Sequence, residues 1–167
     1  MTHPISALGA VHTLISLFPV AAGVVSIARH RVIDPHTRSG KAYLAGLTLS
    51  VLTAFGLSST GGFNPGHALG ILALAAAFGG VLAPRLAFLG KLRPYLFAFG
   101  LSFSFFLMMV PAINETLTRL PAGHPLADGP QSPAVLGTLL AWCVVFAAGF
   151  ALQGWQIHAL RKRGAAA

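Results

Sequence analysis

Charged residues are absent from long stretches of this chain, and the gaps between them predict its helices. No Asp, Glu, Lys or Arg lies between Lys41 and Arg85. A helix needs about 20 apolar residues to cross a bilayer core, so this interval is too long for one crossing. A segment rich in Ser, Gly, Asn and Pro, residues 58–66, divides it near its middle, and that composition is typical of a turn. The interval therefore predicts two membrane helices joined by a tight turn.

The same pattern continues along the chain and predicts an all-α fold, an integral membrane bundle of five transmembrane helices. We expect these helices at about 5–28, 42–57, 67–83, 95–113 and 134–157. No basic segment precedes the first helix, so we expect it to be a retained span rather than a signal peptide. An outer loop is expected at about 114–133, where four prolines disfavour a further helix. Residues 1–167 then form a single transmembrane helical domain.

Two of the expected helices have unusual compositions. The helix at 67–83 is rich in Gly and Ala, which allow helices to approach closely, so we expect it near the centre of the bundle. The helix at 95–113 carries Phe around much of its circumference. We therefore expect part of that helix to face lipid.

Composition agrees with a membrane protein. The chain is 55% hydrophobic and only 8% charged, whereas soluble domains carry about 25% charged residues. The single cysteine, Cys143, excludes an internal disulfide, a CxxC redox pair and a four-Cys iron–sulfur site. In so apolar a chain, the net charge of +8 favours cytoplasmic loops and anionic lipid head groups over nucleic acid.

The basic residues predict the orientation. In the five-helix arrangement, all Lys and Arg residues except Arg119 fall on one side of the membrane, in three clusters: Arg29, Arg31, Arg38 and Lys41; Arg85, Lys91 and Arg93; Arg161, Lys162 and Arg163. Basic loops face the cytoplasm in membrane proteins. We therefore expect the N-terminus outside, the C-terminus inside, and a location in a bacterial inner membrane.

Two histidines are the main candidates for chemistry. His12 lies about two turns into the first helix and His67 opens the third, so both are expected toward the outer face. An ionisable residue inside a membrane span is a functional candidate, and two histidines at similar depth can ligate one metal ion or both faces of a haem. The structural alternatives are a neutral His12 bonded to Ser16 or a backbone carbonyl, and a His67 that caps its helix.

Glu115 is the third candidate. With His12 and His67 it would complete a site of two histidines and one carboxylate, which suits zinc, copper or iron. The alternative is a solvated acid paired with Arg119, four residues later. His124 and Asp128, in the outer loop, are expected near the same mouth.

The remaining histidines are weaker candidates. His30, His36 and His158 fall among the basic clusters, where they would hold a second haem, bind an anionic head group, or simply be solvated. His3 is expected to be a solvated terminal residue.

The order of these features resembles a family of small, uncharacterised bacterial multi-pass membrane proteins, a domain-of-unknown-function group. The resemblance covers roughly residues 10–85 and rests on His12, on His36-Thr37-Arg38-Ser39-Gly40-Lys41-Ala42-Tyr43, and on His67-Ala68-Leu69-Gly70-Ile71-Leu72. A looser similarity to membrane cytochrome b bundles implies His12 and His67 as outer haem ligands and His36 as an inner one. The chain departs from that pattern because no histidine between His67 and His124 is present to pair with His36.

These observations favour a histidine-based redox or metal site near the extracytoplasmic face, holding either one b-type haem for electron transfer or a single transition-metal ion. Two alternatives stay open. One is a non-redox metal-binding or small-molecule transport component that uses His12, His67 and Glu115, and the other is an accessory scaffold subunit. The expected partners are the lipid bilayer, anionic head groups at the cytoplasmic face, and a second copy or a membrane complex. Whether the protein is an enzyme is left open.

Overall fold

The computed structural model describes residues 7–57, 62–121 and 123–164. The elements are α1 (Ala7–His30), α2 (Arg38–Ala54), α3 (Pro65–Leu82), α4 (Arg93–Arg119) and α5 (Pro133–Gly164), with short 3-10 turns η1 (Phe55–Leu57), η2 (Ala83–Arg85) and η3 (Ala87–Leu92). In the described part of the chain, five helices are long and apolar enough to cross a membrane. The all-α prediction and the number of candidate spans are confirmed.

Several helices begin or end outside their expected bounds. α2 begins at Arg38 because the Thr37 side chain caps it, accepting from the Gly40 amide. α4 continues to Arg119, so Asn114 and Glu115 lie in its last turns rather than in a loop. α5 likewise includes Arg161, Lys162 and Arg163. The connection between α4 and α5 is therefore shorter than the sequence suggested.

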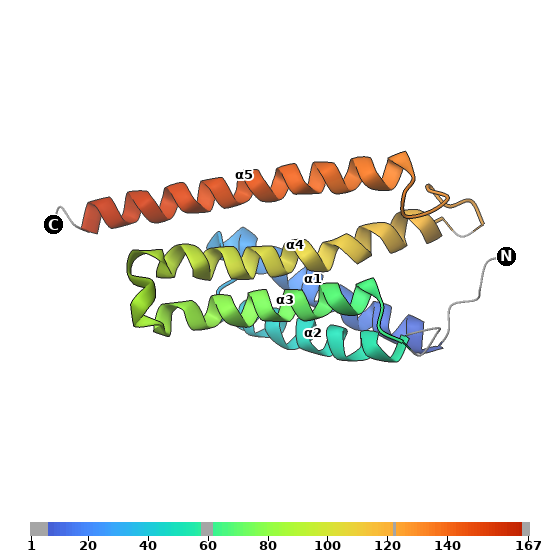
Figure 1. Ribbon diagram of the computed structural model, residues 1–167, viewed down its shortest axis with the longest axis horizontal. Coiled ribbons are helices and arrows are strands. Elements are labelled where there is room, and N and C mark those ends of the chain that lie inside the picture. The colour runs from blue at the N-terminus through green and yellow to red at the C-terminus, as the bar shows by residue number, and fades with distance from the viewer. Residues whose placement is uncertain (1–6, 58–61, 122, 165–167) are drawn as a thin grey trace.

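The first four helices form a ring and α5 lies outside it. α1 packs against α2, α2 against α3, α3 against α4, and α4 closes the ring on α1. α5 packs against α4 and lies on the far side of α4 from α3 (Figure 1). α4 contacts all four other helices and occupies the central position. The small residues of α3 had suggested that position for α3. Those small residues instead allow α3 to lie directly on α4, since Gly80 and Gly100 approach closely.

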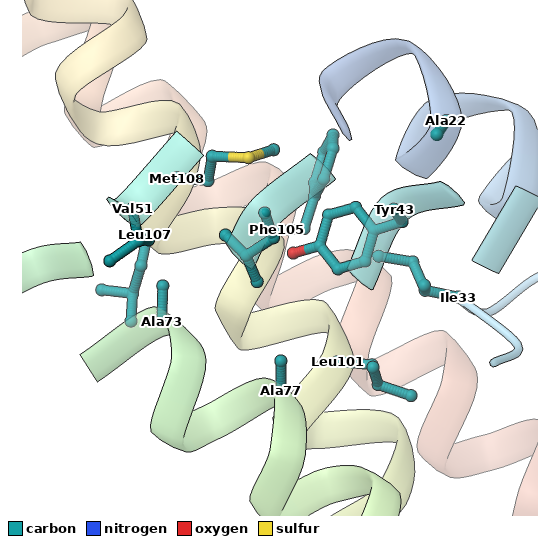
Figure 2. Close-up of a cluster of buried hydrophobic side chains, with 11 residues drawn as sticks. Ala22, Ile33, Tyr43, Val51, Ala73, Ala77, Leu101, Phe105, Leu107 and Met108 are labelled. Carbon is teal, nitrogen blue, oxygen red and sulfur yellow. The ribbon is translucent and has the colours of Figure 1, made fainter. Parts of the chain in front are cut away.

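A buried cluster fills the centre of the four-helix ring. Tyr43, Leu47 and Leu101 are almost completely buried, and Phe105 packs beside Tyr43 with ring centroids 6.1 Å apart. Figure 2 shows Tyr43 reaching from α2 toward this cluster, with Ala73 and Ala77 on α3. This core holds α1 to α4 in fixed positions.

Aromatic rings join α4 to α5. Phe99 lies edge-on to Phe150, and Phe106 packs against Phe146 with centroids 4.9 Å apart. The Trp142 indole N–H donates to the Phe106 carbonyl at 3.2 Å. The phenylalanines of α4 that the sequence suggested would face lipid therefore include several that pack against α5.

The basic clusters gather at one end of the bundle. The α3–α4 connection and the end of α5 lie at one end, while the start of α1 and the α4–α5 connection lie at the other (Figure 1). Arg161 on α5 donates to the Lys91 carbonyl in η3 at 2.7 Å. Gln153 on α5 donates to the Arg31 carbonyl at 2.9 Å. The segments carrying the three basic clusters thus contact one another.

Candidate functional site

His12 lies between α1 and α2, inside a chain of hydrogen bonds. Its ring is half-buried, with Nδ1 2.8 Å from Thr53 Oγ1 and Nε2 3.3 Å from Ser16 Oγ. Ser16 Oγ lies 2.5 Å from the hydroxyl of Ser50. His12 and Ser16 share one face of α1, four residues apart, and Ser50 and Thr53 share one face of α2. The chain therefore runs Ser50–Ser16–His12–Thr53 across the α1–α2 contact.

The partners of Thr53 favour one direction for these hydrogen bonds. The single Thr53 hydroxyl proton is shared between two backbone carbonyls of its own helix, those of Leu49 and Ser50, each at 3.0 Å. The Thr53 oxygen is then left to accept from His12. Nδ1 then carries the proton and Nε2 accepts from Ser16, because a neutral imidazole has one donor and one acceptor nitrogen. Ser50 in turn donates to Ser16. With His12 neutral, every side chain in this hydrogen-bonded chain has a hydrogen-bond partner.

His67 joins the end of α2 to the start of α3. It is only 4% exposed. Its backbone N–H donates to Asn64 Oδ1 at 3.1 Å, and its Nδ1 accepts from the Asn64 backbone N–H at 3.3 Å, which together form a capping box. Nε2 is left to donate to the Ala54 carbonyl at 3.1 Å, one of the carbonyls that the end of α2 leaves without an intrahelical partner. Phe55 stacks on the ring at 4.5 Å.

The structure brings both histidines to the same end of α2. His12 bonds to Thr53 and His67 bonds to the next residue, Ala54. All four ring nitrogens are engaged in hydrogen bonds. A metal ion or a haem iron ligated by both rings would have to displace one of these hydrogen bonds from each ring, and the paired-ligand hypothesis stays a prediction.

Glu115 lies on the exposed surface of α4. Its carboxylate pairs with Arg119 one turn later, as the structural alternative expected. Among the described residues, no group of three or more His, Cys, Asp or Glu side chains is placed to hold a metal ion.

Asn114 adds an unsatisfied group to the C-terminal part of α4. Its side-chain oxygen Oδ1 is buried and has no hydrogen-bond partner among the described residues. Buried polar atoms are normally paired. The C-terminal part of α4 therefore offers one further acceptor besides the His12 chain.

The other histidine candidates lie apart from this site. His36 is exposed in the α1–α2 connection, where its backbone N–H donates to the Asp34 carboxylate at 2.9 Å, at the opposite end of α1 from His12. His30 and His158 are also exposed among the basic clusters, and His124 is exposed near Asp128 in the α4–α5 connection. His3 lies outside the described residues.

Sequence reasoning found His12 and Ser16 but missed Ser50 and Thr53. The signal was present, because the spacing of Ser50 and Thr53 puts their side chains on one face of a helix. It became interpretable only when the structure placed that face against His12. The partner of His67, the Ala54 carbonyl, had no signal in the sequence because every residue carries a carbonyl.

Comparison with known protein families, with curated proteins and with solved structures finds no significant match. The resemblance to small bacterial membrane proteins and the looser one to cytochrome b bundles therefore stay predictions.

Proposed function

We propose that this chain is a five-span protein of a bacterial inner membrane, with its N-terminus outside and its C-terminus in the cytoplasm. The support is the distribution of charge. The Lys and Arg residues other than Arg119 belong to three clusters, and the structure links the segments that carry them through Arg161 and Gln153. The end of the bundle that holds His12 and His67 is then extracytoplasmic.

Within that membrane we propose a non-redox transport component in which His12 takes up and releases a proton. The observation that carries this proposal is the continuous hydrogen-bonded chain Ser50–Ser16–His12–Thr53. Intramembrane histidines mark proton relays and substrate pathways, and an imidazole can gain a proton on one nitrogen while it donates from the other. Hydroxyl groups on either side can turn to accept or donate, so the chain allows both protonation states.

Glu115 has no assigned part in this proton path. Its carboxylate is exposed and forms an ion pair with Arg119 one turn later on α4. The proposal therefore assigns proton binding to His12 and hydrogen bonding on either side of its ring to Thr53 and Ser16.

The test is proton flux into liposomes that contain the purified protein and a pH-sensitive dye. A potassium diffusion potential drives the flux. We expect His12→Gln to reduce the rate about tenfold or more, a loss typical of removing a proton-transfer group. Thr53→Val should also reduce it, because the His12 Nδ1–H loses its acceptor.

Thr48→Val provides the matched control. Thr48 lies on the same helix, and its hydroxyl donates to the Leu44 carbonyl of its own helix at 2.8 Å, so its loss should leave the flux unchanged. Equal flux in the wild-type protein and His12→Gln contradicts the proposal. A loss in Thr48→Val as large as that in Thr53→Val contradicts the assigned path.

The second candidate is a redox centre, one b-type haem or one metal ion held by His12 and His67. The observation in its favour is that the two rings contact adjacent residues of α2. The test is the absorption spectrum of the protein purified in mild detergent, with metal analysis of the same sample. A stoichiometric Soret band that is lost in His67→Ala supports haem. Bound metal whose amount falls in Glu115→Gln supports the metal site. A sample with neither a Soret band nor bound metal rejects the redox centre.

A further inference from the structure

An apolar groove runs along the contact between α3 and α4, toward the basic end of the bundle. Its volume is about 300 Å³, at the lower end of the range for ligand sites. Most of its lining residues are Gly or Ala: Ala75, Ala76, Gly79, Gly80, Ala83 and Gly100. The larger lining side chains are Leu86 and Leu89 from the α3–α4 connection and Leu96 and Phe99 from α4. At Gly79 an added Cβ would meet nothing within 4 Å, so this position opens into the groove.

The short connection at the end of the groove carries cations without an acidic partner. Arg85 and Lys91 are exposed, and neither side chain has a hydrogen bond or ion pair among the described residues. Of the three acids in the chain, Glu115 pairs with Arg119. Arg85 and Lys91 therefore have no ion-pair partner among the described residues.

Two contacts build this end into a defined shape. The Arg93 guanidinium donates to the carbonyls of Leu86 and Ala87, at 3.0 and 2.9 Å, and so fixes the connection against the start of α4. Arg161 donates to the Lys91 carbonyl, which brings the basic end of α5 beside the same connection. An anion here would meet cations from two separate segments.

We propose that this groove binds one anionic phospholipid, with an acyl chain along α3 and α4 and the phosphate at Arg85 and Lys91. The apolar lining and membrane position of the groove fit a hydrocarbon chain. The unpaired cations fit a head group with net negative charge, because each basic residue near a membrane surface attracts anionic lipid. The proposal rests on the proposed insertion in a membrane, but it concerns a different part of the molecule from His12 and does not depend on proton uptake there.

The test is lipid binding by native mass spectrometry in mild detergent. The probes are dioleoyl phosphatidylglycerol and dioleoyl phosphatidylcholine, which have the same acyl chains and differ in head-group charge. We expect tighter binding of the glycerol lipid, in a one-to-one complex. Arg85→Gln and Lys91→Gln should each weaken that binding about fivefold. They should weaken binding of the choline lipid less, because its own ammonium balances the charge of its phosphate.

A second pair of variants tests the groove itself. Gly79→Leu fills it and should weaken binding of both lipids about tenfold, the loss expected from exposing about two methylenes. Gly149→Leu is the control, because it adds the same side chain at an open site on α5 and should bind as the wild type does.

Three outcomes overturn the proposal. Equal affinity of the wild type for the two lipids removes the role of the cations. Equal binding by Gly79→Leu and Gly149→Leu removes the role of the groove. The third outcome is that no phosphatidylglycerol binds, the wild type is a dimer, and Gly79→Leu is a monomer. In that case the groove binds a helix of a second copy of the protein.

Discussion

Tyr43 is a fully buried residue whose polar group has one defined partner. Its hydroxyl lies 2.7 Å from Ser104 Oγ, and Ser104 itself donates to the Leu101 carbonyl at 2.8 Å. The Ser104 proton is therefore already used, and Tyr43 must be the donor between the two. This hydrogen bond joins α2 to α4 in the centre of the bundle.

Removing either partner should destabilise the protein, but by different amounts. Tyr43→Phe removes the donor and should cost about 1 kcal/mol of the free energy of unfolding. Ser104→Ala leaves a buried hydroxyl without an acceptor and should cost more, about 1–3 kcal/mol. The double variant should lose less than the sum. Unfolding in mixed detergent micelles measures these differences.

The control for this pair is Tyr95→Phe. Tyr95 is half-buried, and its hydroxyl has no hydrogen-bond partner in the part of the chain that the structure describes, so its loss should change stability little. Additive losses in the Tyr43–Ser104 double variant would contradict the hydrogen bond as the link between the two residues.

Single residues also show how far sequence reasoning reaches. The spacing of Asn64 and His67 is that of an N-cap and the third residue of a helix, so a capping role was foreseeable, and it was one of the two alternatives. The choice between capping and ligation depended on where the ring nitrogens point. That direction depends on Ala54 and Phe55, which belong to another helix.

Helix contacts in this protein depend on where glycines meet. Gly100 lies against α3 so closely that an added Cβ would be 2.5 Å from the Ala76 carbonyl oxygen and 2.7 Å from the Gly80 Cα. Backbone atoms cannot move aside as a flexible side chain does. The α3–α4 contact therefore requires a residue without a side chain at this position.

Gly100→Ala should force α3 and α4 apart and destabilise the protein by about 1–3 kcal/mol, the usual cost of overpacking. Gly149→Ala on α5, where an added Cβ meets nothing within 4 Å, should be neutral or stabilise by about 1 kcal/mol through higher helix propensity. Thermal unfolding in detergent compares the two. Equal stability of both variants would show that α3 and α4 do not lie as close as described.

At the scale of elements, hydrophobic length predicted the helices well and their ends poorly. The expected end of α4 at residue 113 ignored that Asn114 to Arg119 can continue a helix, stabilised by the Glu115–Arg119 pair one turn apart. Polar residues at a membrane surface can lie in either a helix or a loop. Which of the two they adopt depends on interactions between neighbouring side chains, and a hydropathy pattern carries no information on these.

The proposed orientation of the whole molecule in the membrane is based on its charge. Reporter fusions after Arg85 and after Arg163 should both indicate the cytoplasm, and a fusion after Asp128 should indicate the outside. The reason is the concentration of Lys and Arg on one side of the five-helix arrangement. A fusion after Asp128 that indicates the cytoplasm would reverse the assignment and place His12 at the inner face.

Sequence did not predict how the helices are arranged around one another. Most faces of a membrane helix are apolar whether they meet lipid or protein. The phenylalanines of α4 therefore suggested a lipid-facing surface, although several of them pack against α5. The Gly and Ala residues of α3 correctly indicated close packing, but they did not identify the neighbour as α4. These choices depend on shape complementarity between helices far apart in sequence.

The attachment of α5 bears on how the protein is made. Among the described helices, α4 is the only one against which α5 packs extensively, and Val135 is the only residue of α5 that is fully buried. The core and the His12 chain lie entirely within α1 to α4. α5 is also the last of these helices to leave the ribosome, so the other four can assemble in the bilayer before it arrives. Chains that stop before Pro133 should therefore already contain the folded unit, with α5 joining as a late addition.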